Sequence, residues 1–150
     1  MKKHYLGNVK SNEATIDTYF RIYDPAIRAF RNSYGYASHA MHTTPMDSLA
    51  AGYYCKDNKY YKDPKLLELM HNVLAFMESH HRPNFTIDMM ESNFFCSPLF
   101  EAVNISRAYR IMQKYASTDD EKKLLKRFTD YLPMMEKSLL NGGIHTPNHR

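Results

Sequence analysis

The stretch Asp63-Pro-Lys-Leu-Leu-Glu-Leu-Met-His-Asn-Val-Leu-Ala-Phe-Met-Glu-Ser-His80 decides the fold class of this chain. Asp63-Pro64 is a helix start signal, because aspartate caps the first amides and proline fits the first helical position. Arg82-Pro83 stops the pattern, since the residue before a proline is disfavoured in the helical region. The stretch therefore predicts a long helix from 64 to about 80. Its apolar side chains recur at the three- and four-residue steps of one helical face and are Leu66, Leu67, Met70, Val73, Leu74 and Met77.

Towards the N-terminus, residues 13–34 carry the same helical spacing and predict a second helix. Asp24-Pro25 interrupts it, because proline lacks the amide donor and clashes with the preceding turn, so we expect a kink or restart there. A third, shorter helix is expected to begin at Thr44-Pro45 and to end near Tyr54. The polar segment 55–62 is expected to be a loop.

Towards the C-terminus, Thr86 is expected to cap a short helix or turn over 87–95. Ser97-Pro98 then caps a helix over 99–115, whose wide apolar face predicts burial on more than one side. The capping cluster 117–121 opens the last long helix. Pro133 is expected to kink that helix, and Asn141-Gly142-Gly143 to end it.

No segment shows sustained period-two alternation, so the sequence predicts no strand. We expect a single all-α domain of antiparallel helical hairpins, because the connections between helices are short. The composition agrees, since 43% of the 150 residues are hydrophobic and only 5 are glycine. No repeat of fixed period is found.

The net charge of +4 is spread along the chain, and no nucleic-acid-binding motif accompanies it. We therefore expect no nucleic-acid partner. Cys55 and Cys96 lack metal or redox spacing and are expected to be reduced thiols, one or both of them buried. Neither a signal peptide nor an apolar run of about 18 residues is found, which predicts a cytoplasmic protein, or a periplasmic or secreted one if the N-terminus is incomplete.

Histidine is the natural candidate for acid–base chemistry or metal binding, and the chain has 8 of them. No His-Glu-x-x-His motif occurs, and Pro147 interrupts the helical spacing of His145 and His149, so we expect no metal and no cofactor. His71 is interpreted as a polar-face helix residue. Cys96, next to the Ser97 cap, is interpreted as a buried inert thiol rather than a nucleophile.

The segment 142–150 looks like the opening of another helix, with Thr146 as cap and Pro147 at the first position. We interpret the chain as the N-terminal part of a longer helical protein, or as a truncated reading frame.

Two stretches together resemble a known family. They are Arg82-Pro83-Asn84-Phe85-Thr86-Ile87-Asp88 with Ser92-Asn93-Phe94-Phe95 and Ser97-Pro98, and Gly142-Gly143-Ile144-His145-Thr146-Pro147-Asn148-His149-Arg150. They are similar to the N-terminal helical region of bacterial heparinase II/III-like polysaccharide lyases, which have an incomplete (α/α) toroid followed by β-sandwich domains. The resemblance covers roughly the second half of the chain. No further hairpins and no β-rich part follow in this sequence, so the fragment alone is expected to be of doubtful activity.

The resemblance implies β-elimination on a uronic-acid-containing glycan, with an acidic polysaccharide or oligosaccharide as partner. Such chemistry needs donors for the uronate carboxylate, a base for the neighbouring proton and an acid for the leaving oxygen. It places Asn93 and Arg150 at the carboxylate and His145 or His149 as the base. Asn148 and Glu91 are expected to bind substrate. The acid, a tyrosine in this scheme, stays open among the 12 of the chain.

Two other functions stay open. One is a non-catalytic helical module that binds a partner through a surface rich in tyrosine and methionine. The other is a helical-toroid glycoside hydrolase, for which Asp88 and Glu91 are the local carboxylate pair. Asn93 can also be explained without a site, as a residue that satisfies backbone groups at a helix break.

Overall fold

The computed structural model describes residues 2–31, 37–38, 46–79 and 97–141. Five helices dominate this part of the chain, which confirms the mostly helical fold predicted from the sequence. The helices are α1 (Lys2–Ile22), α2 (Met46–Tyr54), α3 (Pro64–Ser79), α4 (Ser97–Tyr115) and α5 (Asp119–Asn141). Three short strands lie between α1 and α2, namely β1 (Tyr23–Asp24), β2 (Ala29–Arg31) and β3 (Ala37–Ser38).

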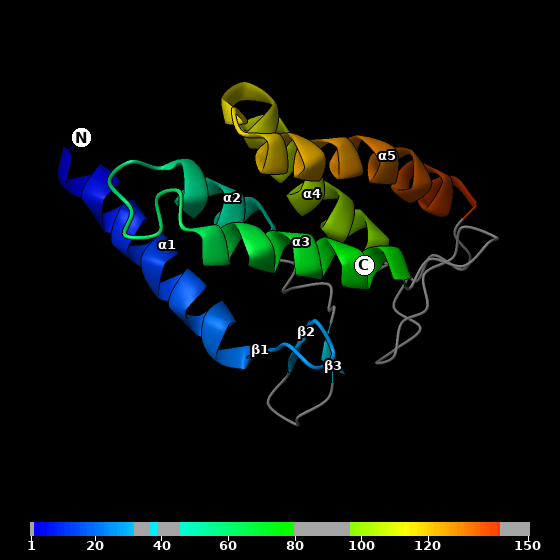
Figure 1. The fold of residues 1–150 in the computed structure, drawn as a ribbon, viewed down its shortest axis with the longest axis horizontal. Coiled ribbons are helices and arrows are strands. Elements are labelled where there is room, and N and C mark those ends of the chain that lie inside the picture. Colours follow the sequence, from blue (N-terminus) through cyan, green and yellow to red (C-terminus); the bar gives the residue numbers. More distant parts are fainter. Residues whose placement is uncertain (1, 32–36, 39–45, 80–96, 142–150) are drawn as a thin grey trace, which may run out of the picture.

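The helices run in alternating directions (Figure 1). Tyr5 near the start of α1 donates to Asp57 just beyond α2, at 2.9 Å, while Asn12 bonds the Ser48 carbonyl near the start of α2, at 3.0 Å. These contacts make α1 and α2 antiparallel. The connections 55–63 and 116–118 return the chain to form the α2–α3 and α4–α5 hairpins. We call the end that holds these two connections the hairpin end, and the opposite end the far end.

The core is built around α2, the shortest helix, which packs against α1, α3 and α4. Five of its nine residues are buried, because each of its faces meets another helix. α4 contacts both α2 and α5, which confirms the predicted burial on more than one side. The largest fully buried side chains of the described residues are Ile16, Met46, Leu49, Leu66, Met70, Leu74, Ile105, Met112, Leu124, Phe128, Tyr131 and Met135.

One glycine allows α1 and α2 to approach closely. A Cβ atom at Gly52 would lie 2.3 Å from Ile16 Cδ1 and 2.8 Å from Asn12 Oδ1. Ile16 is fully buried, so its methyl group has no free space into which to move. Glycine is therefore required at this point of the helix crossing.

The region 13–34 corrects the prediction from sequence. The helix begins earlier, at Lys2, and ends at Ile22, and an antiparallel three-stranded sheet in the order β1-β2-β3 follows, so the prediction of no strand was wrong. Asp24 directs the chain out of the helix, since its carboxylate accepts the Ala26 amide at 2.9 Å and pairs with Arg31 at 2.6 Å. Phe30 is buried as the helical spacing suggested, but it reaches the core from a strand.

The other helices confirm their predicted bounds to within a few residues. α2 ends at Tyr54, α3 begins at Pro64 and α4 begins at Ser97. α5 continues through Pro133 to Asn141 as one helix. The short helix or turn expected over 87–95 lies outside the described residues.

Candidate functional site

The residues predicted to form the site all lie outside the part of the chain that the structure describes. The structure describes the helices that adjoin them in the sequence, namely α3, α4 and α5. The predicted residues are Glu91, Asn93, His145, Asn148, His149 and Arg150. Asp88, the alternative carboxylate, and Cys96 lie outside it as well.

α3 and α5 lie side by side in the same direction. His71 Nε2 lies 3.6 Å from Asp120 Oδ1. Seven residues further along each helix, which is about two helical turns, Glu78 pairs with Arg127 at 2.7 Å. Both helices therefore end towards the far end, at Ser79 and Asn141 (Figure 1). Parallel neighbours of this kind arise when each helix belongs to a separate antiparallel hairpin.

α4 begins at that same end. Only residues 116–118 separate α4 from α5, and the two helices pack against each other as an antiparallel hairpin. The start of α4 at Ser97 therefore lies at the end towards which α5 runs. The described helix ends that adjoin the predicted site residues in the sequence, at Ser79, Ser97 and Asn141, thus all lie at the far end.

Arg127 links α3 to α5 through several donors at once. Its Nη2 donates to Glu78 Oε2 at 2.7 Å, and its Nη1 donates to the His71 carbonyl oxygen at 3.0 Å. The same Nη1 lies 3.1 Å from His71 Nδ1. A guanidinium presents its donors in a fixed fork, so these contacts fix the axial register of α3 relative to α5.

His71 differs from its prediction as a polar-face residue. Its side chain is only 21% exposed, because it faces α5 rather than solvent. Burial lowers the pKa of His71 below the 6.5 of an unperturbed histidine; Asp120 opposes this shift, whereas Arg127 and Lys123 add to it. The imidazole is therefore neutral at pH 7.

The hairpin end is held together by a buried carboxylate. Glu121 is fully buried and accepts from Tyr53 Oη at 2.9 Å, Lys62 Nζ at 2.5 Å and the Ser117 amide at 2.7 Å. It also completes a capping box with Thr118, whose Oγ1 accepts the Glu121 amide at 3.3 Å. Burial by itself raises the pKa of Glu121, but Lys62 and these amides bring it down to about 2.

Lys62 connects this carboxylate to two tyrosine rings. Its ammonium lies 4.2 Å from the ring centroid of Tyr54 and 5.0 Å from that of Tyr53. The Lys62 backbone is left-handed, with φ 55°, and its amide donates to the Tyr53 carbonyl at 2.9 Å. Burial, with the nearby Glu121 charge, raises the pKa of both tyrosines. These contacts hold the loop between α2 and α3 against α5, so we interpret their role as structural.

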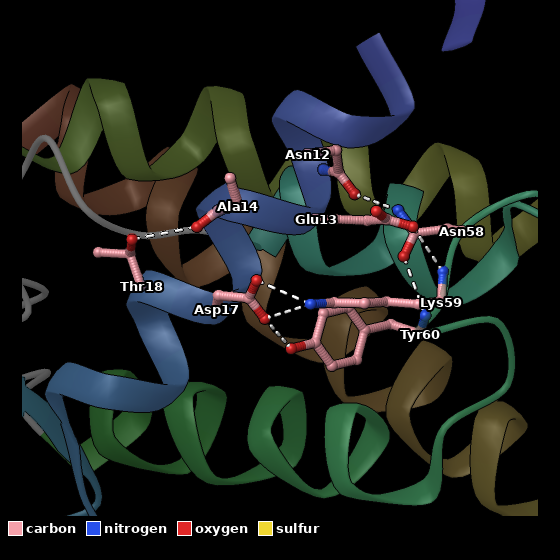
Figure 2. A network of polar contacts seen from close by, with 8 residues as sticks. All are labelled: Asn12, Glu13, Ala14, Asp17, Thr18, Asn58, Lys59 and Tyr60. Carbon is pink, nitrogen blue, oxygen red and sulfur yellow. Dashed lines mark hydrogen bonds and ion pairs between the residues drawn. The ribbon is translucent and has the colours of Figure 1, made fainter. Parts of the chain in front are cut away.

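A second network fastens the same loop to α1 (Figure 2). Buried Asn58 donates to Asn12 Oδ1 at 2.9 Å, and the Lys59 amide donates to Glu13 Oε1 at 2.8 Å. The Lys59 ammonium and the Tyr60 hydroxyl both donate to Asp17, and the Lys59 contacts measure 2.7 Å. The side chains from the loop and from α1 point towards one another and satisfy one another, so this network is also structural.

Two networks of side-chain contacts therefore fasten the hairpin end, one around Glu121 and one between Asn58 and α1. Within residues 2–31, 37–38, 46–79 and 97–141, no group of three or more His, Cys, Asp or Glu side chains could hold a metal ion. Cys55 is a half-buried free thiol. The sequence did mark Glu121 as part of a capping cluster, but it gave no sign that Lys62 pairs with Glu121 or that Arg127 pairs with Glu78 and His71.

None of the described helices has the length and apolar character needed to cross a membrane. No family model matches this chain, and neither a curated protein nor a solved structure matches it.

Proposed function

We propose that this chain contributes helical hairpins of an (α/α) toroid in a carbohydrate-active protein of the polysaccharide-lyase type. One observation supports the proposal most: α3 ends at Ser79, α4 begins at Ser97 and α5 ends at Asn141 on the same side of the molecule. The stretches that carry the resemblance adjoin these three residues in the sequence. A common end of this kind favours a site shared by Asn93 and His145.

The proposed reaction is β-elimination at a uronic acid. Asn93 and Arg150 donate hydrogen bonds to the uronate carboxylate, which stabilises the negative charge that develops when the adjacent proton leaves. His145 or His149 takes that proton as base. The bond to the glycosidic oxygen then breaks, a carbon–carbon double bond forms in the uronate, and a tyrosine protonates the leaving oxygen. Asn148 and Glu91 bind the sugar.

The described residues narrow the choice of the tyrosine acid. Tyr53 and Tyr54 have raised pKa values, but they lie at the hairpin end, where Tyr53 already donates to Glu121. A far-end site needs an acid from another part of the chain. Tyr53 and Tyr54 are therefore excluded from that role in this proposal.

The test is to incubate a full-length form that contains this chain with a panel of uronic-acid-containing glycans and to follow the ultraviolet absorbance of the unsaturated uronate. We expect signal with at least one acidic glycan. Asn93→Ala and His145→Ala should each reduce turnover while the helical circular-dichroism signal is kept. Asn8→Ala and His4→Ala, on the exposed surface of α1 near the hairpin end, are matched controls that should leave turnover unchanged. Absence of signal across the panel would refute the proposal.

A second candidate is a helical interaction module, and exposed tyrosines favour it. Tyr5, Tyr61 and Tyr115 are 41–50% exposed and belong to elements that meet at the hairpin end. Of the described methionines, Met134 is half-buried and the others are buried in the core, so they add little exposed surface to this end; the buried ones are Met46, Met70, Met77, Met112 and Met135. A partner that binds this end should lose affinity when Tyr61 and Tyr115 are changed to Ser, and unchanged affinity would exclude the tyrosines as its contact.

A further inference from the structure

The contact between Arg127 and His71 fixes the position of the imidazole proton. A guanidinium has only donors, so His71 Nδ1, 3.1 Å from Arg127 Nη1, must accept a hydrogen bond through its lone pair. The neutral ring then carries its proton on Nε2. This atom is buried and has no hydrogen-bond partner among the described residues, and Asp120 Oδ1 is 3.6 Å away.

Protonation of His71 would convert this attraction into repulsion. The second proton must go to Nδ1, where it would point at the guanidinium and remove the acceptor. Both groups would then be positive at a distance at which the described structure has a hydrogen bond. Arg127 remains charged at any relevant pH, so it cannot relieve the conflict by losing a proton.

The charges around His71 come from the helix packed against it and from its own helix. α5 contributes Asp120, Lys123 and Arg127, and α3 contributes Glu78, which already pairs with Arg127. The other elements packed against α3 direct their described charged and titratable groups elsewhere. On α2, Asp47 lies 3.5 Å from Arg107, Tyr53 donates to Glu121 and the Tyr54 ring faces Lys62; on β2, Arg31 pairs with Asp24.

We propose that His71 and Arg127 form an acid-sensitive latch that holds α3 beside α5. The latch is closed while His71 is neutral, and it weakens when the imidazole gains a proton and repels Arg127 Nη1, while the Arg127 bonds to Glu78 and to the His71 carbonyl remain.

The free energy of unfolding should fall as the pH falls, because protonation of His71 weakens the latch. The pKa of His71 is lower in the folded chain than the 6.5 of an unperturbed histidine, so the unfolded chain binds more protons just below that pH. The stabilisation is therefore complete above pH 6.5 and is lost as the pH falls through the folded pKa. Within that window the ratio of folded to unfolded chains falls by at most about tenfold per pH unit, the limit for uptake of one proton.

The first test uses nitrogen NMR of the histidine side chains in the unmodified protein. We expect His71 to carry its neutral-state proton on Nε2 and to titrate below 6.5, the pKa of an unperturbed histidine. A proton on Nδ1, or a His71 titration at or above pH 6.5, would overturn the latch. This measurement needs no variant and no substrate, so its result is independent of lyase activity.

The second test removes the members of the latch one at a time. Arg127→Met should raise the pH at which His71 titrates, because the positive neighbour is lost, and an unchanged or lower titration would refute the role of Arg127. His71→Asn should flatten the dependence of unfolding on pH just below 6.5. His4→Asn is the matched control and should keep the slope of the unmodified protein. Equal slopes in both Asn variants would contradict the proposal.

Discussion

Adding a single methyl group at Gly52 tests the packing between α1 and α2. The Cβ atom of Gly52→Ala would lie 2.3 Å from Ile16 Cδ1 and 2.8 Å from Asn12 Oδ1, whereas carbon atoms in contact are normally about 3.5–4.0 Å apart. Ile16 must therefore leave its position in a filled core. Asn12 must also shift, although its side chain bonds both the Ser48 carbonyl and Asn58.

The expected change in the free energy of unfolding is the sum of three terms, of which two destabilise the fold and one stabilises it. Inserting a methyl group into a packed core costs about 1–3 kcal/mol. Each hydrogen bond of Asn12 that is lost costs roughly 1 kcal/mol more. Alanine gains up to about 1 kcal/mol over glycine inside a helix, which offsets only part of this cost. We expect a net loss of about 2 kcal/mol, which corresponds to a fall in Tm of roughly 4–8 °C for a chain of this size.

Gly7→Ala is the matched control, because the same methyl group at Gly7 on α1 meets no atom within 4 Å. It should stabilise the protein by up to about 1 kcal/mol through helix propensity alone. Thermal and urea unfolding followed by circular dichroism measure both variants. If Gly52→Ala were as stable as the unmodified protein, or if both variants shifted stability in the same direction, the close crossing of α1 and α2 would be refuted.

Two further predictions concern the hairpin end. Glu121→Gln should lower the free energy of unfolding by about 2 kcal/mol at pH 7, because the charge-assisted hydrogen bond from the partly exposed Lys62 is lost. It should also remove a loss of stability that the unmodified protein shows as the pH falls from 4.5 towards 2; that loss amounts to roughly 3 kcal/mol, and acid unfolding measures it against the exposed Asp130→Asn control. Asn58→Ala should cost about 1–3 kcal/mol, because Asn12 loses a buried partner, whereas Lys59→Met should cost less than about 1 kcal/mol, because its pair with Asp17 is half exposed. Urea unfolding ranks these two variants, and the reverse order would contradict the burial argument.

The helices that the sequence predicted well carry their start and stop signals locally. Asp63 caps α3, with its carboxylate 2.9 Å from the Lys65 amide, and Ser97 opens α4. The capping box at Thr118 and Glu121 opens α5 in the same way. Short-range chemistry of this kind can be read from neighbouring residues alone.

The region before α2 depended on contacts that the sequence does not reveal. The polar start of α1 has little apolar periodicity, yet it is helical where Val9 is buried and Tyr5 donates to Asp57. The strands are two or three residues long, too short for a period-two pattern to show. Phe30 fitted a helical step by coincidence, because a strand returning to Tyr23 also brings it to the core.

The contacts of Arg127 with His71 and Glu78 could not be predicted either, because they too join residues far apart in the sequence. Arg127 and His71 are 56 residues apart, and neither carries a local signal of the other. The parallel direction of α3 and α5 follows only from such contacts. The predicted residues Asn93, His145, Asn148, His149 and Arg150, with Glu91, stay predictions, because they lie outside the described chain.

The most direct test of the central claim is an NMR titration of the protein with a uronic-acid oligosaccharide. The claim is that segments 80–96 and 142–150 contribute to one site. We predict that the Asn93 side-chain amide and the His145 and His149 imidazoles shift together with a single Kd. Shifts confined to one of the two segments, or confined to the hairpin end around Tyr5 and Tyr61, would contradict it.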